Sequence, residues 1–366
     1  MPKRTPLYDE ERKLGARFTE FAGWELPLYY SSIIEEHMAV RKSCGLFDIS
    51  HLGKIAASGE ATFSFLQSTA TNDIAKISPG SGEYTLFCNE SGGIIDDDII
   101  YRLADTSYLI VTNAAPTMTM LNWLNEKKPD KVEVENLTED FCLLALQGPN
   151  SPQVLQSIFK ENPADYSHYT VRAITALGNK FTVSKSGYTG EEGFEILCEP
   201  AAAKSAWRAM LEYGIKPAGL GARDTLRLEM GYPLYGQDIT IETNPVEAGL
   251  VRFVAVDKGE FIGRKSIFER IEKGASKKLA GFIIDRGIPR SGKTVLSTSG
   301  DEIGIVTSGG YSPVLRRGVG MAYIRSEFAE VGLPIEIEAD KKQLKGHIAK
   351  RPFIDMRRPK AFSAAS

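Results

Sequence analysis

The chain has 366 residues, of which 42% are hydrophobic, and its formal net charge is −3. A chain of this length can bury a large core, and we expect two or three domains. The charge argues against broad binding of nucleic acid, which needs a strongly basic surface, and the longest apolar runs are too short to span a bilayer. Residues 1–6 hold no apolar segment behind their charges, so we expect neither a signal peptide nor a transit peptide, and a cytoplasmic location.

Cysteine and histidine are sparse, and their spacing fits no metal site. The four cysteines stand apart beside apolar residues and form no CxxC or CxxH pair, so we expect buried, reduced thiols. The four histidines include no pair with metal-binding spacing, and we therefore expect a mechanism without a metal. These residues are Cys44, Cys88, Cys142 and Cys198, and His37, His51, His168 and His347.

Helical and strand patterns alternate along most of the chain. Ser32 and Glu35 form a capping box that opens a helix through Val40, which Gly45 can end. Hairpin turns, and not long crossovers, separate several strands, which favours an α+β fold of helices on antiparallel sheets. Further helices are expected at 61–68, 117–127, 151–160, 201–213 and 220–230, and strands at 53–58 and near Tyr84, Ile99, Leu109, Leu143, Phe181 and Phe194.

His51 follows an acid and a serine in the segment Asp48-Ile49-Ser50-His51, an arrangement that suggests a hydrolytic triad. A triad serine usually stands on an exposed elbow such as GxSxG, which the chain lacks. The sequence therefore argues against nucleophilic catalysis at this position.

Three consecutive carboxylates leave a Gly-Gly turn and enter an apolar strand of a predicted hairpin. Side chains alternate along a strand, so we expect Asp96 and Asp98 on one face. Asp97 is expected on the other face, with Ile95 and Ile99 as its neighbours. A carboxylate among isoleucines is costly without a polar partner. The acids therefore either solvate the end of a hairpin or belong to a functional site.

Residues 187–195 form a glycine-rich turn followed by a strand that carries Glu195. The spacing fits neither GxGxxG nor the P-loop, and two glutamates inside the loop would repel a phosphate, so we reject nucleotide binding. Whether Glu195 points inward or outward depends on the direction of Phe194, which the sequence leaves open. A solvated strand residue is the structural alternative to a functional acid.

Arg223 and Arg227 lie one turn apart in the helix predicted after Gly219. Arg223 stands in the first turn, where a cation opposes the helix dipole. A residue placed against its local preference often meets a partner. That partner is either a structural carboxylate or an anionic ligand.

From residue 277 onward the pattern changes to short strands split by Gly, Ser and Pro turns, which is typical of a small β-barrel or sandwich. A helix at 264–273 and the polar residues 274–276 form the expected linker. The basic segment 350–358 is either a solvated tail or a receiver for the carboxylates of a ligand or partner. The strands are expected at 282–284, 294–296, 303–306, 320–324, 335–337 and 344–348.

Taken in order, these segments resemble the T-protein family of the glycine cleavage system, which comprises tetrahydrofolate-dependent aminomethyltransferases. No single motif carries the resemblance, which rests on the order of the segments and on their coverage of nearly the whole chain. They are residues 4–7 (RTPL), 21–24 (FAGW), 38–41 (MAVR), 45–51 (GLFDISH), 71–73 (TND), 89–97, 147–149 (QGP), 187–195, 219–224, 235–238 (YGQD), 307–309 (TSG) and 352–353 (PF).

The resemblance implies an α+β fold of three domains around a central opening in which folate lies. Residues 1–50 and 141–262 would form a discontinuous folate-binding domain. Residues 51–140 would form a second domain that carries Asp97, and residues 277–358 a C-terminal β-barrel-like domain. Residues 359–366 are expected to be a disordered tail.

The resemblance also implies the site residues. Asp97 would be the catalytic acid, which orients the folate near N10 and offsets developing positive charge. Glu195 would accept hydrogen bonds from the pterin edge, and Arg223 would serve the acceptors of that edge. The other residues placed at the folate are Leu52, Tyr84, Val111 and Asn113 around the ring, and Arg358 at the benzoyl-glutamate portion. Leu52 and Lys54 replace the Met and Glu of many relatives, which concerns affinity more than activity.

The implied donor is an S-aminomethyl-dihydrolipoyl arm on a separate lipoylated H protein, and tetrahydrofolate is the acceptor. The products are ammonia and methylene-tetrahydrofolate. One alternative is a folate-binding iron–sulfur assembly factor, but the segment that matches its KGCYxGQE motif, Leu234–Ile239, holds no cysteine. Another is a folate-dependent demethylase subunit, which is normally fused to a flavin domain for which the chain has no fingerprint.

Overall fold

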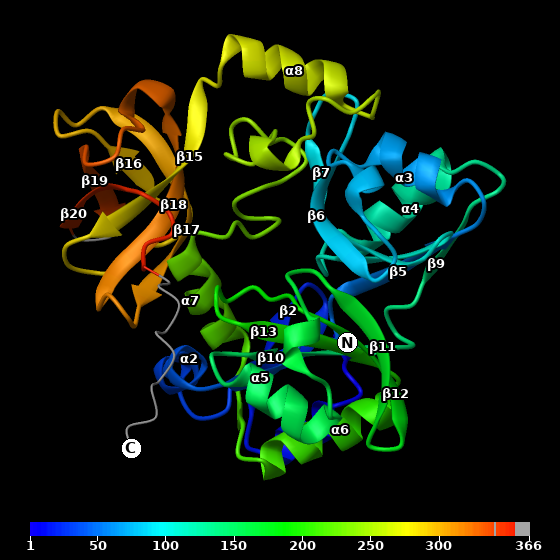
Figure 1. Cartoon of the computed structure of the whole chain (residues 1–366). Helices are drawn as coiled ribbons and strands as arrows, with labels where there is room; N and C mark the ends of the chain where they lie inside the picture. Colours follow the sequence, from blue (N-terminus) through cyan, green and yellow to red (C-terminus); the bar gives the residue numbers. More distant parts are fainter. Residues whose placement is uncertain (340–341, 356–366) are drawn as a thin grey trace.

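The computed structural model describes residues 1–339 and 342–355, and within these ranges the strands form four sheets. Figure 1 shows the C-terminal barrel, a five-stranded sheet and a six-stranded sheet arranged around the segment that joins α7 to α8. The small N-terminal sheet has the order β1-β3-β2. Its strands are β1 (Lys3–Arg4), β2 (Arg17–Phe21) and β3 (Trp24–Tyr29), and α1 (Tyr8–Lys13) lies between β1 and β2.

The six-stranded sheet has the order β11-β12-β13-β10-β4-β14 and is antiparallel except for the β14–β4 pair. One face packs on α6 (Pro200–Glu212), where Trp207 is fully buried. The other face packs on α7 (Leu220–Met230) and α2 (Ile33–Lys42). The strands are β4 (Gly45–Asp48), β10 (Cys142–Gln147), β11 (Val171–Ala176), β12 (Asn179–Ser184), β13 (Gly193–Cys198) and β14 (Lys216–Pro217).

The five-stranded sheet has the order β6-β7-β8-β5-β9, and all its pairs are antiparallel. Two helices, α3 (Thr62–Thr69) and α4 (Thr117–Lys127), contribute to the core on one face of it. The strands are β5 (Gly53–Ser58), β6 (Ser81–Cys88), β7 (Ile94–Ala104), β8 (Ser107–Thr112) and β9 (Glu133–Asn136).

The C-terminal strands close into an antiparallel barrel with the order β15-β18-β17-β16-β19-β20. The predicted α+β fold with a C-terminal barrel is therefore confirmed. Helix α8 (Arg264–Lys273) precedes the barrel, as expected. The strands are β15 (Lys277–Ile284), β16 (Thr294–Leu296), β17 (Glu302–Ser312), β18 (Arg317–Arg325), β19 (Pro334–Ala339) and β20 (Lys342–Ala349).

One predicted helix has a different form in the structure. The segment expected to be helical at 151–160 begins as α5 (Ser151–Val154), continues as a π-helix over Leu155–Phe159, and ends at Lys160, whose φ is 62°. Single π-turns are inserted within α-helices without a strong sequence signal. The remaining short helices are 3₁₀ turns at Ile74–Lys76, Pro163–Asp165, Val251–Phe253 and Ser326–Phe328.

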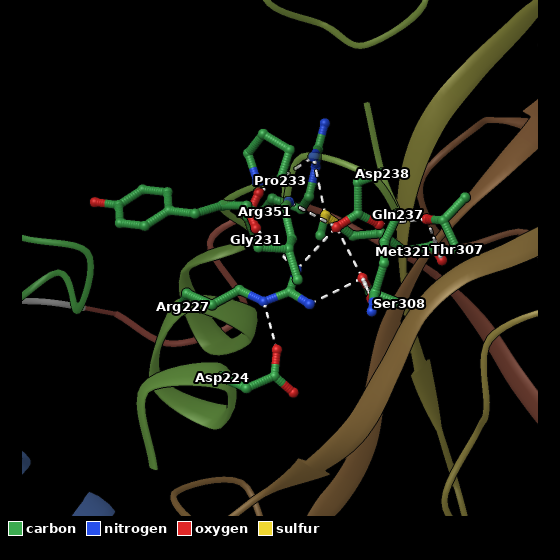
Figure 2. Close-up of polar contacts among 12 residues, drawn as sticks. Asp224, Arg227, Gly231, Pro233, Gln237, Asp238, Thr307, Ser308, Met321 and Arg351 are labelled. Carbon is green, nitrogen blue, oxygen red and sulfur yellow. Dashed lines mark hydrogen bonds and ion pairs between the residues drawn. The ribbon is translucent and has the colours of Figure 1, made fainter. Parts of the chain in front are cut away.

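Helix α7 is joined to the barrel by a buried polar network around Arg227 (Figure 2). The Arg227 guanidinium donates to Asp224 at 2.8 Å, to Asp238 at 2.9 Å and to the Ser308 hydroxyl at 2.9 Å. The Thr307 hydroxyl also donates to Asp238. Because Ser308 and Thr307 belong to β17, this network attaches α7 to the barrel wall.

Among the described residues, no helix is long and apolar enough to cross a membrane, and the cytoplasmic location stays a prediction.

Candidate active site

The turn between β6 and β7 directs the acidic strand into the site. The Asn89 carboxamide oxygen accepts hydrogen bonds from the backbone of Ser91 at 3.1 Å and of Gly93 at 2.9 Å. Gly92 has φ +80°, and a Cβ at Gly93 would lie 1.9 Å from the backbone oxygen of Ile241. Both glycines are therefore required by the backbone, the first for its conformation and the second for its close contact.

Side chains along β7 alternate between the two faces of the sheet, but this alternation is interrupted just before the three aspartates. Ile95 is the extra residue of a β-bulge between Ile94 and Asp96. It packs in the same core as Ile100, on the face opposite Asp97. The prediction that Ile95 neighbours Asp97 is therefore wrong, because an inserted residue shifts the alternation by one.

Ile99 lies on the face of β7 opposite Ile95, so the prediction that Ile99 is a neighbour of Asp97 holds. Ile99 packs against the same core cluster as Leu197 of the six-stranded sheet, a cluster that includes Val171 of that sheet. Asp97 has the same parity as Ile99 and is half-buried. Its side chain therefore points toward the region between the two sheets.

Asp97 is held by two donors. Its Oδ2 accepts a hydrogen bond from the Tyr84 hydroxyl at 2.8 Å, and its Oδ1 accepts one from the Asn113 carboxamide at 2.8 Å. The same Asn113 nitrogen lies 2.8 Å from Asp96 Oδ1, which also accepts from the Asp97 backbone at 2.9 Å. Tyr84 packs edge-on against Phe253, with ring centroids 4.4 Å apart. The carboxylate therefore has a fixed orientation.

The three aspartates are buried together, and this raises the pKa of each. Burial raises the pKa of Asp96 to about 6 and raises the pKa of Asp97 and Asp98 well above the usual aspartate value, and repulsion from Asp96 raises the latter two further. Neither oxygen of Asp98 meets a donor among the described residues, and Asp96 is its carboxyl neighbour. Burial and the neighbouring carboxyls therefore favour the protonated form of Asp98.

A cavity of about 900 Å³ lies between the small N-terminal sheet, α7, the barrel strand β17 and the loops that follow β4, β8 and β12. Three expected site residues, Leu52, Asn113 and Arg223, line it. Four other expected site residues do not line the cavity in the described part of the chain, but they lie close to residues that do. Asp97 accepts a hydrogen bond from Asn113, and Tyr84 donates to Asp97. Val111 packs against the same core cluster as Leu52, and Glu195 is close enough to Arg223 for the guanidinium to lower its pKa. Arg358 lies outside the described residues.

Glu195 is buried, not solvated. It is 5% exposed on β13, while its neighbour Phe194 is fully buried against α6 on the opposite face. The Ser186 hydroxyl donates to the Glu195 carboxylate. Burial raises the pKa of Glu195, and Ser186 and Arg223 oppose this shift. Both faces of this sheet are covered, so the strand shows no polar face in its sequence. The sequence therefore left the direction of the Glu195 side chain undecided.

Arg223 is a cation with spare hydrogen-bonding capacity. Its Nη1 is enclosed and has no partner among the described residues. The guanidinium lies over the Tyr188 ring, 5.0 Å from the centroid. Burial lowers the pKa of Arg223, and Glu195 and Tyr188 oppose this shift, but a guanidinium stays protonated in proteins. The sequence left two kinds of partner open for Arg223, a structural carboxylate or an anionic ligand. Within the described residues, Arg223 forms no ion pair with a carboxylate.

Tyr188 is a site residue that sequence reasoning missed. It lines the cavity and its hydroxyl donates to the backbone of Pro233. Tyr235 lines the same cavity. The one sequence signal that could have identified Tyr188 is its position directly after a glycine in the 187–195 turn.

His51 also lines the cavity, but it forms no triad. The Ser50 hydroxyl donates to Asp48, and no described residue forms a hydrogen bond with His51. Burial, with Arg223 and Lys54 nearby, lowers the pKa of His51 to about 3, so the ring is neutral. Lys54 is buried and donates to the Ser50 carbonyl at 2.7 Å.

The thiols of the chain are buried. All four cysteines are free, and burial raises the pKa of each. A thiol in this state is a poor nucleophile. Within the described ranges, no group of three or more His, Cys, Asp or Glu side chains is placed to hold a metal ion.

Comparison with known proteins gives consistent matches over nearly the whole chain. Residues 7–258 match the family described as "GCVT N-terminal domain", and residues 277–355 match "Glycine cleavage T-protein C-terminal barrel domain". An aminomethyltransferase of Halothermothrix orenii is 44% identical over 357 residues, which cover 96% of this chain and 100% of the relative. One of Geobacillus sp. (strain WCH70) is 43% identical over 360 residues, covering 96% and 99%.

A solved structure is similar throughout. The crystal structure of the glycine cleavage system aminomethyltransferase T from Bartonella henselae superposes with a TM-score of 0.92 at 33% identity, and the match covers 98% of this chain and 99% of that one.

Proposed function

Because this chain belongs to the glycine cleavage T-protein family, we propose that its central cavity transfers the aminomethyl group of a lipoylated H protein to tetrahydrofolate. The chain is an aminomethyltransferase. The products are 5,10-methylenetetrahydrofolate, ammonia and the dihydrolipoyl H protein. The name shared by the relatives favours this activity over an iron–sulfur assembly factor or a demethylase subunit.

The residues present fit a pterin. Its ring has N–H donors on one edge and a carbonyl acceptor nearby. Arg223 brings its unpartnered nitrogen to the cavity lining, and the buried carboxylate of Glu195 lies close enough for Arg223 to lower its pKa. Tyr188 and Leu52 supply flat and apolar surface for the ring faces. The enclosed, unpartnered Nη1 of Arg223 is the observation that carries the proposal, because a buried cationic donor without a partner indicates an acceptor that arrives with a ligand.

Tetrahydrofolate, when bound, supplies the nucleophilic nitrogen and accepts the one-carbon unit. The chain's own contribution is position and charge. We assign Asp97 to orient the folate near N10, with Tyr84 and Asn113 fixing the carboxylate. Its negative charge would offset the positive charge that develops during transfer, and its raised pKa brings it closer to the range where a carboxyl exchanges protons.

The sulfur that carries the aminomethyl group would come from a partner. All four cysteines are buried, and none lines the central cavity. The lipoyl arm of an H protein fits this requirement, because it brings a sulfur on a flexible arm into a cavity of about 900 Å³. We place the site where the three proposed domains meet, at residues 1–50 with 141–262, 51–140 and 277–358.

Ammonia release from aminomethylated H protein, with and without tetrahydrofolate, tests this function. We expect release to require both substrates and to fall sharply in Arg223→Ala. The exposed Arg208 pairs with Glu10 on the surface, so Arg208→Ala is a matched control that should behave as the parent chain. Equal release without tetrahydrofolate, or full activity on N-methyl amines alone, would contradict the proposal.

A further inference from the structure

His51 is a buried titratable residue at the cavity to which the proposed mechanism gives no role. It follows β4, is 2% exposed and contributes to the cavity lining. Its ring packs edge-to-face against Phe21, with centroids 5.9 Å apart and an interplanar angle of 89°. Phe21 also lines the cavity. The orientation of the imidazole is therefore set by packing before any ligand binds.

The two ring nitrogens of His51 have different surroundings. Nδ1 is enclosed by protein and has no hydrogen-bond partner among the described residues. Nε2 has no described partner either, but it is not enclosed. Because the side chain borders the central cavity, the accessible nitrogen is the one that a ligand there can reach.

Charge determines which form the ring takes. The charged groups that face His51 are Arg223 on α7 and Lys54 on β5, both cationic, and with burial they keep the ring neutral. A neutral imidazole has one N–H donor and one bare acceptor nitrogen. A buried N–H without a partner is rarer in proteins than a buried acceptor without one. The proton therefore belongs on Nε2, and the bare nitrogen is the enclosed Nδ1.

We propose that His51 donates its Nε2–H to the pterin carbonyl oxygen of tetrahydrofolate, beside Arg223, and so acts as a positioning residue for the folate. This inference rests on the proposed function. A carbonyl oxygen has two acceptor sites, which suits two neighbouring donors. The acidic counterpart, Glu195, serves the N–H groups of the same ring. A neutral second donor adds a hydrogen bond next to Arg223 without adding a second positive charge.

Three substitutions at His51 separate this role from packing. The carboxamide nitrogen of His51→Gln reaches approximately as far as Nε2, that of His51→Asn stops near Nδ1, and His51→Leu has no donor. Calorimetry of the full chain with tetrahydrofolate should give a dissociation constant within about 3-fold of the parent for His51→Gln, and about 10-fold weaker for His51→Asn and His51→Leu, as expected for one lost hydrogen bond.

Phe181→Leu in the core of the six-stranded sheet is the control for general loss of stability, because Phe181 is remote from the cavity lining. It should lower the melting temperature without weakening folate binding. Unchanged affinity in His51→Leu would overturn the proposal. So would equal losses in the Gln and Leu variants, which indicate packing alone.

Nitrogen NMR of histidine-labelled protein gives a readout that does not depend on activity. The chain has four histidines, so His51→Gln identifies the His51 signals by their loss. We expect a neutral ring with the proton on Nε2 in the free protein, and a shift of that N–H when tetrahydrofolate saturates the site. A proton on Nδ1, or no shift at saturation, would overturn the inference while leaving the proposed function intact. A parent chain that binds no tetrahydrofolate would instead contradict the proposed function, and the tautomer in the free protein would still be tested.

Discussion

Arg223 and Arg227 lie one turn apart on α7, yet only Arg227 has its hydrogen-bonding capacity filled from within the chain. Arg227 is 2% exposed and donates to Asp224, Asp238, Ser308 and a backbone carbonyl. Arg223 Nη1 is enclosed and lacks a partner among the described residues. The same helix therefore uses one arginine to attach to the barrel and the other at the cavity.

Replacing Asp97 with Asn should preserve the fold and remove most of the activity. The Tyr84 hydroxyl can turn and the Asn113 carboxamide can still donate, but the negative charge is lost. By analogy with losing one preorganised polar partner, we expect turnover to fall by roughly 10²-fold or more. Steady-state turnover at saturating tetrahydrofolate measures this. Asp98→Asn is the control and should be milder, because Asp98 lies on the face of β7 opposite Asp97. Near-normal turnover in folded Asp97→Asn would refute the assignment.

Removing either polar group at the proposed pterin end should weaken folate binding. Arg223→Ala and Glu195→Ala each leave an edge of the ring without its partner in a buried site, at an expected cost of about 1–3 kcal/mol. Titration calorimetry with tetrahydrofolate checks both variants against Arg208→Ala, whose arginine is exposed. If both variants bind as tightly as the parent, these residues are structural.

Breaking the buried pair between Arg227 and Asp238 should destabilise the whole chain. The side chains are 2% and 0% exposed, so removing one partner leaves a buried charge uncompensated. We expect Arg227→Ala to lower the free energy of unfolding by about 3–5 kcal/mol. Urea denaturation followed by circular dichroism measures this loss. A change no larger than that of Arg208→Ala would mean that water enters and solvates Asp238.

Glu11 should make the stability of the chain fall as the pH rises. It is fully buried in α1, and burial with nearby Asp48 raises its pKa from 4.5 to about 9. The folded state therefore holds a proton that the unfolded state releases, and this stabilisation is complete below about pH 4.5 and is lost as the pH rises toward 9. Glu11→Gln keeps a neutral side chain at every pH.

Melting temperatures of Glu11→Gln and the parent at pH 5, 7 and 9 test this linkage. The difference between variant and parent should grow in favour of the variant as the pH rises. A constant difference across the series would show that folding does not raise the pKa of Glu11.

Activity with the carrier protein should respond to salt, and activity with a small substrate should not. Transient partners bind through small, partly polar interfaces whose association is screened by ions. We expect kcat/KM with aminomethylated H protein to fall as ionic strength rises. Turnover of free aminomethyl-dihydrolipoamide should be slower and nearly insensitive. Parallel responses of the two substrates would exclude an electrostatic docking step.

The elements of the fold were predictable where the local pattern is strong. The capping box of Ser32 is present, with the Glu35 backbone donating to its hydroxyl at 3.3 Å, and α4, α7 and α8 have the expected bounds. Alternation failed at Ile95 because a β-bulge leaves no simple mark in sequence. The inward position of Glu195 was undecidable because its sheet is buried on both faces.

The candidate site was harder to predict than the fold because its residues come from separate elements. Asp97 and Arg223 were candidate site residues because each charge stands in an unfavourable position. Asp97 lies in an apolar strand, and Arg223 lies in the first turn of a helix. The sequence carried no sign that Tyr188 would lie under the Arg223 guanidinium or that burial beside Asp96 would raise the pKa of Asp98. Both relationships depend on how distant segments pack, so they appear only in three dimensions.

The burial of the cysteines has a consequence for the fate of the transferred carbon. A carbon bonded to both sulfur and nitrogen readily passes from one thiol to another, so any reachable thiol in the catalyst would trap it and inactivate the chain by self-modification. Cys44, Cys88, Cys142 and Cys198 are all enclosed in hydrophobic cores with raised thiol pKa values. The one-carbon unit is thus bonded to one sulfur only, that of the incoming lipoyl arm. The folate nitrogens are then the nucleophiles that remain to accept it.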